Sequence, residues 1–437
     1  MVGIIGLILA VAVVIFTIWK NWHMAIVSLL GALVVIAFNG MNLTDTLTKS
    51  FMAQMSSFAG NWFLLFMLGA IFGKVMGDSG ASIGIANNLL KVLGDKYVIL
   101  VIMITGTVLS YGGIGTFIIA FSIYPIAVAL FQKADISKKL IVATIMVSPV
   151  TVCMAMLPGS PSTQNLLPTT IFHTTAYAGS AIGLICSVVM FASAYFYLNW
   201  QMKKAKAKGE HFTANEGEVI MDLNAADNGE LPAIWKCYVP IILLLVAMFI
   251  LQKATKIPSS YAVAYSMILA IVVGCFLYRD KLKIQKTICD GASGGLGALI
   301  ATSAIMGFGG VVSASPAYSQ IVKGLLGMNV NPLIMALLSI NVIAAITGSS
   351  MGGLNIFLNS MGNYMIATGL NPSFLHRMVC IASSGFDAMP HASGIVVCNQ
   401  IAKTSQKDTY KHVFITCALM PFCCAILACI LGSIGII

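Results

Sequence analysis

Long apolar runs separated by short polar loops make up most of the chain. A helix of about 20 apolar residues crosses the ~30 Å hydrocarbon core of a bilayer, so each run of this length predicts one transmembrane span. Ten runs meet that description, at about 2–18, 22–39, 60–77, 138–172, 178–199, 237–251, 259–278, 288–312, 375–400 and 413–436. Polar residues interrupt the runs 138–172 and 375–400. The pattern therefore predicts an all-α polytopic membrane protein.

Two further runs, 97–131 and 331–370, are too long for one ordinary span and too short for two spans joined by a loop. Neither run contains a charged residue, and each has a glycine-rich polar centre, at 110–116 and at 347–355. We interpret each run as a re-entrant helical hairpin. The non-helical tip of such a hairpin is tolerated at membrane depth where it is buried in protein or faces a water-filled cavity.

The composition fits a membrane protein and argues against a nucleic-acid-binding one. Hydrophobic residues make up 59% of the chain and charged residues only 9%, against roughly a quarter charged in soluble domains. The net charge is +10, but the basic residues lie in short loops and form no patch with interleaved aromatic residues. The polar segment 201–236 begins with four lysines, and placing it in the cytoplasm puts 19 of the 24 Lys and Arg residues on the inner side.

The chain divides into two similar halves, 1–200 and 237–437, joined by the polar segment 201–236. Three pairs of short stretches match at an offset of about 233 to 240 residues: 70–73 with 304–307, 89–94 with 322–327, and 112–113 with 352–353. Each half reads as three spans, a hairpin, a broken span and a final span. Because five spans is an odd number, we expect the second copy to be inverted in the membrane. Chance similarity between apolar segments is the alternative.

The interruptions of the two broken spans are the best candidates for a binding site. They are Leu157-Pro158-Gly159-Ser160-Pro161-Ser162-Thr163-Gln164-Asn165 and the stretch 383–394, which contains Pro390. Proline removes a backbone donor and clashes with the preceding turn, so we expect each stretch to split its span into two half-helices. Free N–H groups at a half-helix start suit an anion, and freed carbonyls suit a cation. The alternative is a proline kink that neighbouring helices repair.

Polar groups near the hairpin tips and the breaks are the candidate substrate ligands. With no Lys or Arg placed deep in a span, a small anion with hydroxyl groups would be held by backbone N–H groups and uncharged side chains. The candidates are Gly112, Gly113, Thr116, Ser160, Ser162, Thr163, Asn165, Ser349, Ser350, Gly352, Gly353 and Asn355. Any of the hydroxyl or amide side chains could instead join helices to one another.

Asp387 and His391 are the candidate proton-coupling residues. Asp387 is the carboxylate that we place in the middle of a span, where an ionisable group is costly and marks a functional site. His391 follows one turn later and would share its face if the stretch were helical. Histidine titrates near neutral pH, so His391 is the better candidate for a transferred proton. The alternative is a buried Asp–His pair that holds the loop in shape. No metal site or cofactor is predicted.

The broken spans and their flanking loops resemble a known family. The stretches ALFQKADISKKL (129–140), MLPGSPSTQNLLPTTIF (156–172), IASSGFDAMPHASGIVV (381–397) and SQKDTYKHVF (405–414) are similar to the gluconate permease family of proton-coupled symporters, within the wider ion transporter superfamily. Where gluconate carriers have an Asp-Leu-Pro-His-Asn-Gly type of motif, this chain has 388–394, AMPHASG. That departure looks more like the 3-hydroxybutyrate-type branch.

The resemblance implies a multi-pass protein of a bacterial plasma (inner) membrane. It implies a scaffold and a transport domain in each protomer, an elevator-type movement and a homodimer surrounded by membrane lipids. The expected function is inward symport of a small hydroxy monocarboxylate with a proton. The alternatives are a sodium-coupled organic anion symporter or an antiporter, and more remotely a channel or an intramembrane enzyme. An enzyme would need a second carboxylate or a metal-binding pair beside Asp387, and the sequence offers neither.

Overall fold

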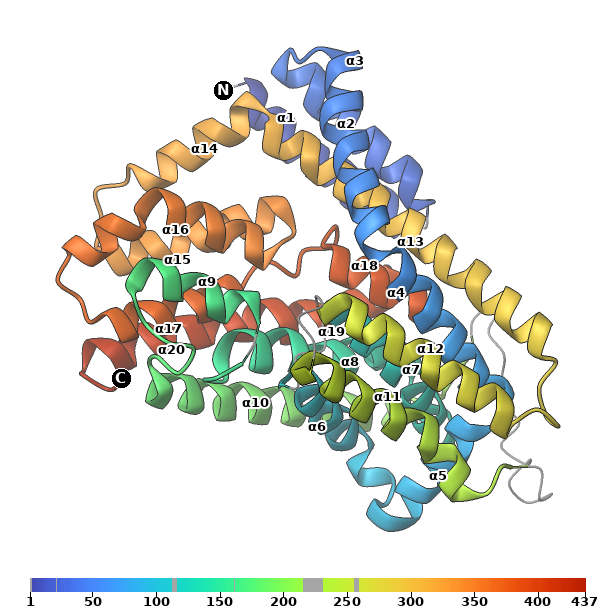
Figure 1. Cartoon of the computed structure of the whole chain (residues 1–437). Coiled ribbons are helices and arrows are strands. Elements are labelled where there is room, and N and C mark those ends of the chain that lie inside the picture. The colour runs from blue at the N-terminus through green and yellow to red at the C-terminus, as the bar shows by residue number, and fades with distance from the viewer. Residues whose placement is uncertain (1, 21, 112–115, 161, 215–230, 255–258) are drawn as a thin grey trace.

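Every regular element in the described part of the chain is a helix (Figure 1). The computed structural model describes residues 2–20, 22–111, 116–160, 162–214, 231–254 and 259–437. The elements are α1 (Val2–Trp19), α2 (Met24–Asn39), α3 (Leu43–Thr46), η1 (Leu47–Met52), α4 (Ala53–Asp78), α5 (Ala81–Leu93), η2 (Asp95–Tyr97), α6 (Val98–Tyr111), α7 (Thr116–Lys133), η3 (Lys138–Leu140), α8 (Ile141–Val147), η4 (Ser148–Met156), α9 (Thr163–Phe172), α10 (Ser180–Ala207), α11 (Ile234–Ala254), α12 (Ser259–Leu277), α13 (Ile284–Ala314), α14 (Pro316–Leu326), α15 (Pro332–Thr347), α16 (Ser350–Ala367), α17 (Pro372–Ser383), α18 (Ser393–Ala402), α19 (Gln406–Phe414), η6 (Ile415–Leu419) and α20 (Met420–Ser433). The predicted all-helical class is confirmed.

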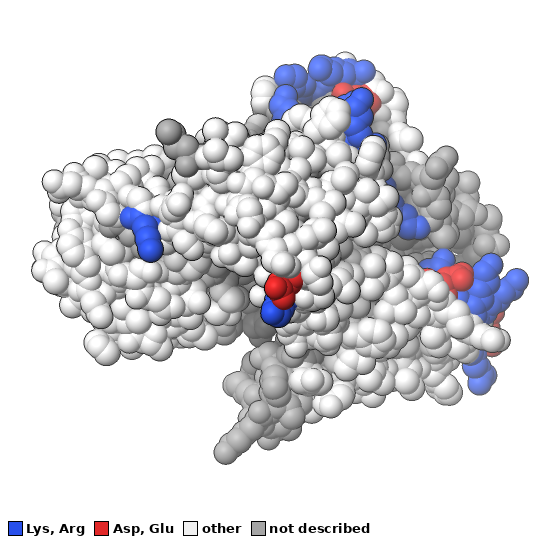
Figure 2. Space-filling model, turned by 90° about the horizontal axis from the view of Figure 1, so that it is seen from above, with Lys and Arg blue, Asp and Glu red and all other residues white. Residues whose placement is uncertain are grey.

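The outer surface of the helices is that of a multi-pass membrane protein. Among the described residues, six helices are long and apolar enough to cross a membrane. Large apolar side chains point outward, such as Ile8 on α1, Val188 on α10 and Phe276 on the shorter apolar helix α12, each at least 67% exposed. Figure 2 shows charged side chains in a few separate groups, with broad uncharged areas between them. Water would oppose so much exposed apolar surface, whereas lipid accepts it.

Two long helices, α4 and α13, pack against each other in opposite directions along much of their length (Figure 1). Glycines on α13 make the contact possible. A Cβ atom at Gly295 would lie 2.4 Å from the carbonyl oxygen of Phe66, and one at Gly291 would lie 2.8 Å from the Cα of Ile71. The pair α1–α2 packs on α13, and the pair α11–α12 packs on α4. These helices support the elements that carry the candidate site.

The two runs predicted as hairpins are helix pairs. Helices α15 and α16 pack side by side and turn at Gly348 and Ser349. Helices α6 and α7 also pack on each other, and their tip at 112–115 lies outside the described residues. Each of the two broken spans is also present as predicted: η4 and α9 are separated by 157–162, and α17 and α18 by 384–392.

The hairpins and the broken spans of the two halves pack across each other. Helix α9, the second part of the first broken span, packs on α16 of the second hairpin. Helix α18, the second part of the second broken span, packs on α7 of the first hairpin. Val397 of α18 shares a buried apolar cluster with Phe121 of α7. Each half therefore supplies one side of each contact.

Several elements differ from the sequence-based expectation. The short helices α5 and α14 follow α4 and α13 and were not predicted, because they are too short to register as spans. Helix α10 continues to Ala207, into the predicted linker 201–236. The residues 201–207 are Gln, Met, Lys and Ala, all strong helix formers, which explains the extension.

The start of the polar linker is attached to the loop between α7 and η3. Lys139 pairs with Glu210 at 3.0 Å, and the Nδ1 atom of His211 lies 2.6 Å from Oδ2 of Asp135. The backbone N–H of Phe212 donates to the other oxygen of Asp135 at 2.9 Å. These hydrogen bonds from His211 and Phe212 lower the pKa of Asp135 from its ordinary value. The loop that follows α7 is thereby held against the residues that follow α10.

Candidate functional site

Helices α9 and α16 begin next to each other. The Nε2 atom of Gln164, the second residue of α9, donates to Oγ of Ser350, the first residue of α16, at 2.8 Å. Further along, Gly362 of α16 lies against Ile171 of α9, so the two helices run in the same direction. The first N–H groups of a helix have no carbonyl partner within it and carry a partial positive charge. Two such helix starts side by side form a place for an anion.

The first break is shaped by its own polar side chains. Ser162 caps α9 by accepting from the N–H of Asn165 at 3.2 Å, and its hydroxyl donates to the carbonyl of Met154 at 2.5 Å. The side-chain amide of Asn165 donates to the carbonyls of Ser160 at 2.8 Å and Ala176 at 3.0 Å. Backbone groups freed by the broken helix are thus satisfied by nearby side chains, as burial requires.

The second break lies against the turn of the second hairpin. Oδ1 of Asn341 on α15 accepts from the N–H of Phe386 at 2.9 Å. Nε2 of His391 lies 3.2 Å from the carbonyl oxygen of Ile346, near the end of α15, and donates to it. The His391 ring also packs edge-on against Phe308 of α13, with ring centroids 6.1 Å apart. The second hairpin, the second break and helix α13 therefore meet at His391.

The second break starts before its proline. Helix α17 ends at Ser383, whereas Pro390 follows seven residues later. A Cβ atom at Gly385 would lie 1.9 Å from Oδ1 of Asn341, so the absence of a side chain at Gly385 lets Asn341 reach the freed backbone. The break therefore begins where the amide of Asn341 replaces a helical hydrogen bond.

Asp387 and His391 are buried and each has an unpaired polar atom. Asp387 is 8% exposed and His391 4%. Within the described residues, neither Oδ1 of Asp387 nor Nδ1 of His391 has a hydrogen-bond partner. A buried unpaired polar atom costs about 1–3 kcal/mol, so such atoms call for a functional reason. No hydrogen bond or ion pair joins the two side chains in the described structure, and 384–392 is not helical. Asp387 and His391 therefore do not form a hydrogen-bonded pair in the described structure.

The remaining candidate residues occupy different environments. Thr116 begins α7, and its hydroxyl donates to the sulfur of Met154 at 3.1 Å in the first break. Ser160 and Asn165 are fully buried, and Ser162 is half-buried. Thr163 is exposed at the start of α9. Gly112 and Gly113 lie outside the described residues.

On the second hairpin the candidates shape the helix start. Ser349 caps α16 by accepting from the N–H of Gly352 at 3.2 Å. Gly353 allows α15 and α16 to approach, since a Cβ atom there would lie 2.7 Å from the carbonyl oxygen of Ile340. Asn355 is exposed, and its Oδ1 accepts from Asn359 at 3.0 Å. Ser350 is thus the hydroxyl of this group that contacts the first broken span, through Gln164.

The expectation that no basic residue lies deep in a span is wrong. Arg377 lies within α17 and is fully buried. Its guanidinium group donates to the carbonyl oxygens of Ala178 at 2.8 Å and Ala176 at 3.0 Å, and more distantly to that of Met156 at 3.4 Å. The Met156 carbonyl is at the C-terminal end of η4, where the helix dipole is negative. A single arginine among the apolar residues of 374–382 was the signal in the sequence.

A second buried residue on α17, His376, was also missed. Its Nε2 atom lies 3.2 Å from Oδ1 of Asn165, and its Nδ1 atom lies 2.7 Å from Oγ1 of Thr174. Together with Arg377 it fastens α17 to the first break and to the loop that follows α9. The two broken spans therefore form one packed unit.

The turn of the second hairpin gives a testable prediction. Gly348 has φ of +61°, and a Cβ atom there would lie 3.0 Å from the Cα of Ala392 and 3.1 Å from Cδ2 of His391. We expect Gly348→Ala to push the hairpin away from His391 and to lower the transport rate by about ten- to a hundredfold, the cost of a misplacement of roughly 1 Å. Initial uptake rates and thermal unfolding would be measured together.

Gly369→Ala is the matched control for this change. Gly369 also has a positive φ, +75°, but no atom lies within 4 Å of the position of its missing Cβ. Both variants carry the same backbone cost of about 1–2 kcal/mol. Equal transport rates in the two variants would show that the contact between Gly348 and His391 is unimportant.

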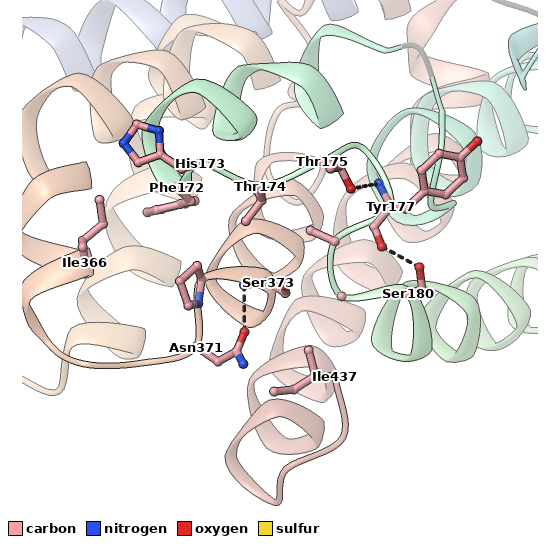
Figure 3. Close-up of a pocket in the computed structure, with 13 residues that line it drawn as sticks. Phe172, His173, Thr174, Thr175, Tyr177, Ser180, Ile366, Asn371, Ser373 and Ile437 are labelled. Carbon is pink, nitrogen blue, oxygen red and sulfur yellow. Dashed lines mark hydrogen bonds between the residues drawn. The ribbon is translucent and has the colours of Figure 1, made fainter.

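A surface pocket of about 770 Å³ lies at the other end of α9 (Figure 3). It is lined by Phe172, His173, Thr174, Thr175, Tyr177, Ala178, Gly179, Ser180, Ile366, Asn371, Pro372, Ser373 and Ile437. Hydrogen bonds of Tyr177 with Thr175 and with Ser180 shape the loop beside it. The pocket adjoins the first break, because its lining residue Tyr177 packs against Gly159, where a Cβ atom would lie 2.4 Å from the Tyr177 ring.

Comparisons with known proteins point to transport. The sequence model described as "GntP family permease" matches residues 2–433. A protein of Bacillus subtilis (strain 168) named "Uncharacterized transporter YxjC" is 29% identical, over 94% of this chain and 95% of its own. An "Uncharacterized permease" of Haemophilus influenzae is 26% identical, over 80% of this chain and 75% of its own. A second H. influenzae protein, an "Uncharacterized transporter", is 22% identical over 90% of this chain.

Proposed function

Because the chain belongs to the GntP permease family, we propose that it is a secondary transporter that carries a small hydroxy monocarboxylate into the cell together with a proton. The observation that carries this proposal is the pair of buried, unpaired atoms in the second break, Oδ1 of Asp387 and Nδ1 of His391. Both atoms can accept a proton, and the ring of His391 lies beside Gly348, in the turn that precedes α16. Permeases are not enzymes, and the family supports that expectation here.

The adjacent starts of α9 and α16 support an anionic substrate. Their N–H groups, with Thr163 and Ser350, would hold a carboxylate, and hydroxyl groups nearby would hold the hydroxyl of the substrate. Arg377 does not take part directly, since the carbonyls of Ala176 and Ala178 occupy its donors. The Thr116 end of α7 would close the site from the first half.

The arrangement of helices supports two inverted repeats. Each half has a helix pair, a long helix, a short helix, a hairpin, a broken span and a long final helix, in that order. The two hairpins and the two broken spans form one unit, in which each hairpin packs on the broken span of the opposite half. Helices α4 and α13 form a second unit. We propose that the first unit moves against the second as an elevator, in a homodimer, with the linker 201–236 in the cytoplasm of a bacterial cell.

The motif around Pro390 supports the 3-hydroxybutyrate-type branch. Ala388 and Ala392 lie on either side of Met389-Pro390-His391, and both alanines are nearly fully buried. Ala392 packs under Gly348, so small side chains define the wall of this part of the site. The proposal of a short hydroxy acid rests on the resemblance of 388–394 to the 3-hydroxybutyrate-type branch.

Uptake into proteoliposomes tests the proposal. The purified chain would be reconstituted with an alkaline interior and supplied with labelled 3-hydroxybutyrate or gluconate. We expect accumulation of the label, with a limit of about tenfold for each pH unit of gradient and each coupled proton. Uptake that ignores the pH gradient and follows a sodium gradient would support sodium coupling instead. Single-channel currents would identify a channel.

A further inference from the structure

The side chain of Asn165 is held in place at both ends by hydrogen bonds. It is fully buried, and its amide nitrogen donates to the carbonyls of Ser160 at 2.8 Å and Ala176 at 3.0 Å. Because carbonyl oxygens only accept, this end of the side chain must be the NH2 group and the other end the oxygen. That oxygen, Oδ1, lies 3.2 Å from Nε2 of His376. Both amide hydrogens of Asn165 are therefore engaged by the protein, and none remains for a substrate.

The orientation of Asn165 determines which nitrogen of His376 carries a hydrogen. Because Oδ1 of Asn165 only accepts, Nε2 of His376 must carry a hydrogen and donate it. The other nitrogen of a neutral imidazole accepts, so the hydroxyl of Thr174 donates to Nδ1 of the fully buried His376 at 2.7 Å. Donation therefore runs in one direction through the network, from Thr174 through His376 to Asn165.

This network joins a surface loop to the start of a helix. Thr174 is half-buried in the loop 173–179, between α9 and α10, and lines the surface pocket. Asn165 is the third residue of α9. The carbonyl oxygen of Ala176, in the same loop, accepts from Asn165 and also from the N–H of Gly159 in the first break, at 2.9 Å. The loop is therefore docked on the first break.

We propose that His376 is a positioning residue, which keeps the start of α9 in its anion-binding geometry while the loop 173–179 is docked on the first break. This inference rests on the proposed function. Asn165 lies in the same first turn of α9 as Thr163, and the backbone N–H groups of that turn are the proposed ligands of the anion. Since a misplacement of about 1 Å costs a binding group much of its effect, loss of the hydrogen bond to Asn165 weakens anion binding.

The place of the loop in the chain gives this network a role in transport. Helix α10 is long and apolar enough to cross the membrane, and it connects the loop 173–179 to the linker 201–236. With the linker in the cytoplasm, the loop lies on the outer side, from which the substrate enters. A displaced loop withdraws the hydroxyl of Thr174 from His376, so docking of the loop and binding of the anion favour each other.

The test measures KM and the turnover rate for uptake of labelled 3-hydroxybutyrate and gluconate, with the full chain in proteoliposomes. We expect His376→Leu to raise KM about two- to tenfold, the effect of one lost hydrogen bond, while the turnover rate stays near that of the wild type. His376→Gln should restore most of the wild-type KM, because its amide can donate from near the position of Nε2. His376→Asn should not, because its amide reaches only the position of Nδ1.

Thr174→Val tests the far end of the network, because valine has nearly the shape of threonine but lacks the donor. Thr174 acts on Asn165 through His376, so we expect KM to rise in this variant as well. The double variant with His376→Leu should have the KM of His376→Leu alone, since both changes break the same network. Thr174→Ser, which keeps the hydroxyl, should have the wild-type KM.

Thr170→Val and His412→Leu are the matched controls. Thr170 is exposed and donates within α9, to the carbonyl of Leu167 at 2.8 Å. His412 of α19 is half-buried, and its Nδ1 atom lies 3.1 Å from the hydroxyl of Tyr197, outside the network. Both variants should keep the wild-type KM. Thermal unfolding of every variant would be measured beside uptake.

The outcomes separate this inference from the proposed function. A wild type that takes up neither acid would overturn the proposed function, and this inference with it. An active wild type with an unchanged KM in His376→Leu would overturn the inference alone, even where the turnover rate and the unfolding temperature fall. Additive effects of His376→Leu and Thr174→Val would contradict it as well. Where His376→Leu does not fold, a wild-type KM in both Thr174→Val and His376→Asn would overturn the inference.

Discussion

Asp387→Asn should abolish proton-driven accumulation while leaving the carrier able to exchange substrate. Asparagine has nearly the same shape and can donate a hydrogen bond as a protonated carboxyl does, but it cannot ionise. The variant is therefore held in the state that binds the anion, and the pH gradient no longer drives uptake. We expect the accumulation ratio to fall from about tenfold per pH unit to about one, with counterflow of labelled substrate preserved.

Asp408→Asn is the control for this experiment, because Asp408 is exposed in the first turn of α19. It should accumulate substrate as the wild type does. If Asp387→Asn still concentrates substrate against a gradient, Asp387 does not carry the coupled proton, and His391→Gln becomes the variant to measure. Loss of both accumulation and counterflow would indicate a binding role for Asp387 instead.

Arg377→Met should destabilise the protein more than any other single change considered. The guanidinium group is fully buried and donates to the carbonyls of Met156, Ala176 and Ala178. The carbonyls of Met156 and Ala178 would lose this donor at a cost of about 1–3 kcal/mol each, a large part of the ~5–15 kcal/mol by which a folded protein is stable. The Ala176 carbonyl keeps the amide of Asn165. We expect a marked drop in the thermal unfolding temperature and in the yield of monodisperse protein in detergent.

Two variants make that result interpretable. Arg377→Lys should be intermediate, because one ammonium group cannot reproduce the fixed fork of donors. Arg279→Met should be neutral, since Arg279 is 68% exposed on its side chain and pairs only with the neighbouring Asp280 at 3.6 Å. An Arg377→Met protein that unfolds at the wild-type temperature would show that water or lipid satisfies these carbonyls.

Much of the fold could be predicted because glycine, proline and polar residues mark the places where its apolar helices are interrupted. Glycine-rich centres in the charge-free runs identified the helix pairs, and the two Pro/Gly-bearing stretches identified the breaks to within a few residues. The inward position of Asp387 also followed from a single carboxylate in an apolar run. Such features depend on the physical chemistry of one short segment, so one sequence is enough to reveal them.

What could not be predicted depends on contacts between distant segments. The reach of Asn341 into the second break requires the open space at Gly385, and the two residues are far apart in the chain. Arg377 was overlooked because its charge is balanced by carbonyl groups, which every sequence contains. The contact of Gln164 with Ser350 joins opposite halves of the chain. The orientation of the Asp387 and His391 side chains likewise depends on a backbone that is not helical.

The packing of each hairpin on the broken span of the other half has a consequence for biogenesis. Helix α9 of the first half packs on α16, and α7 packs on α18. When the ribosome has completed only the first half, the faces of α9 and α7 that make these contacts have no protein partner. Assembly of the site therefore waits for insertion of α15 to α18, and neither half is a self-sufficient folding unit.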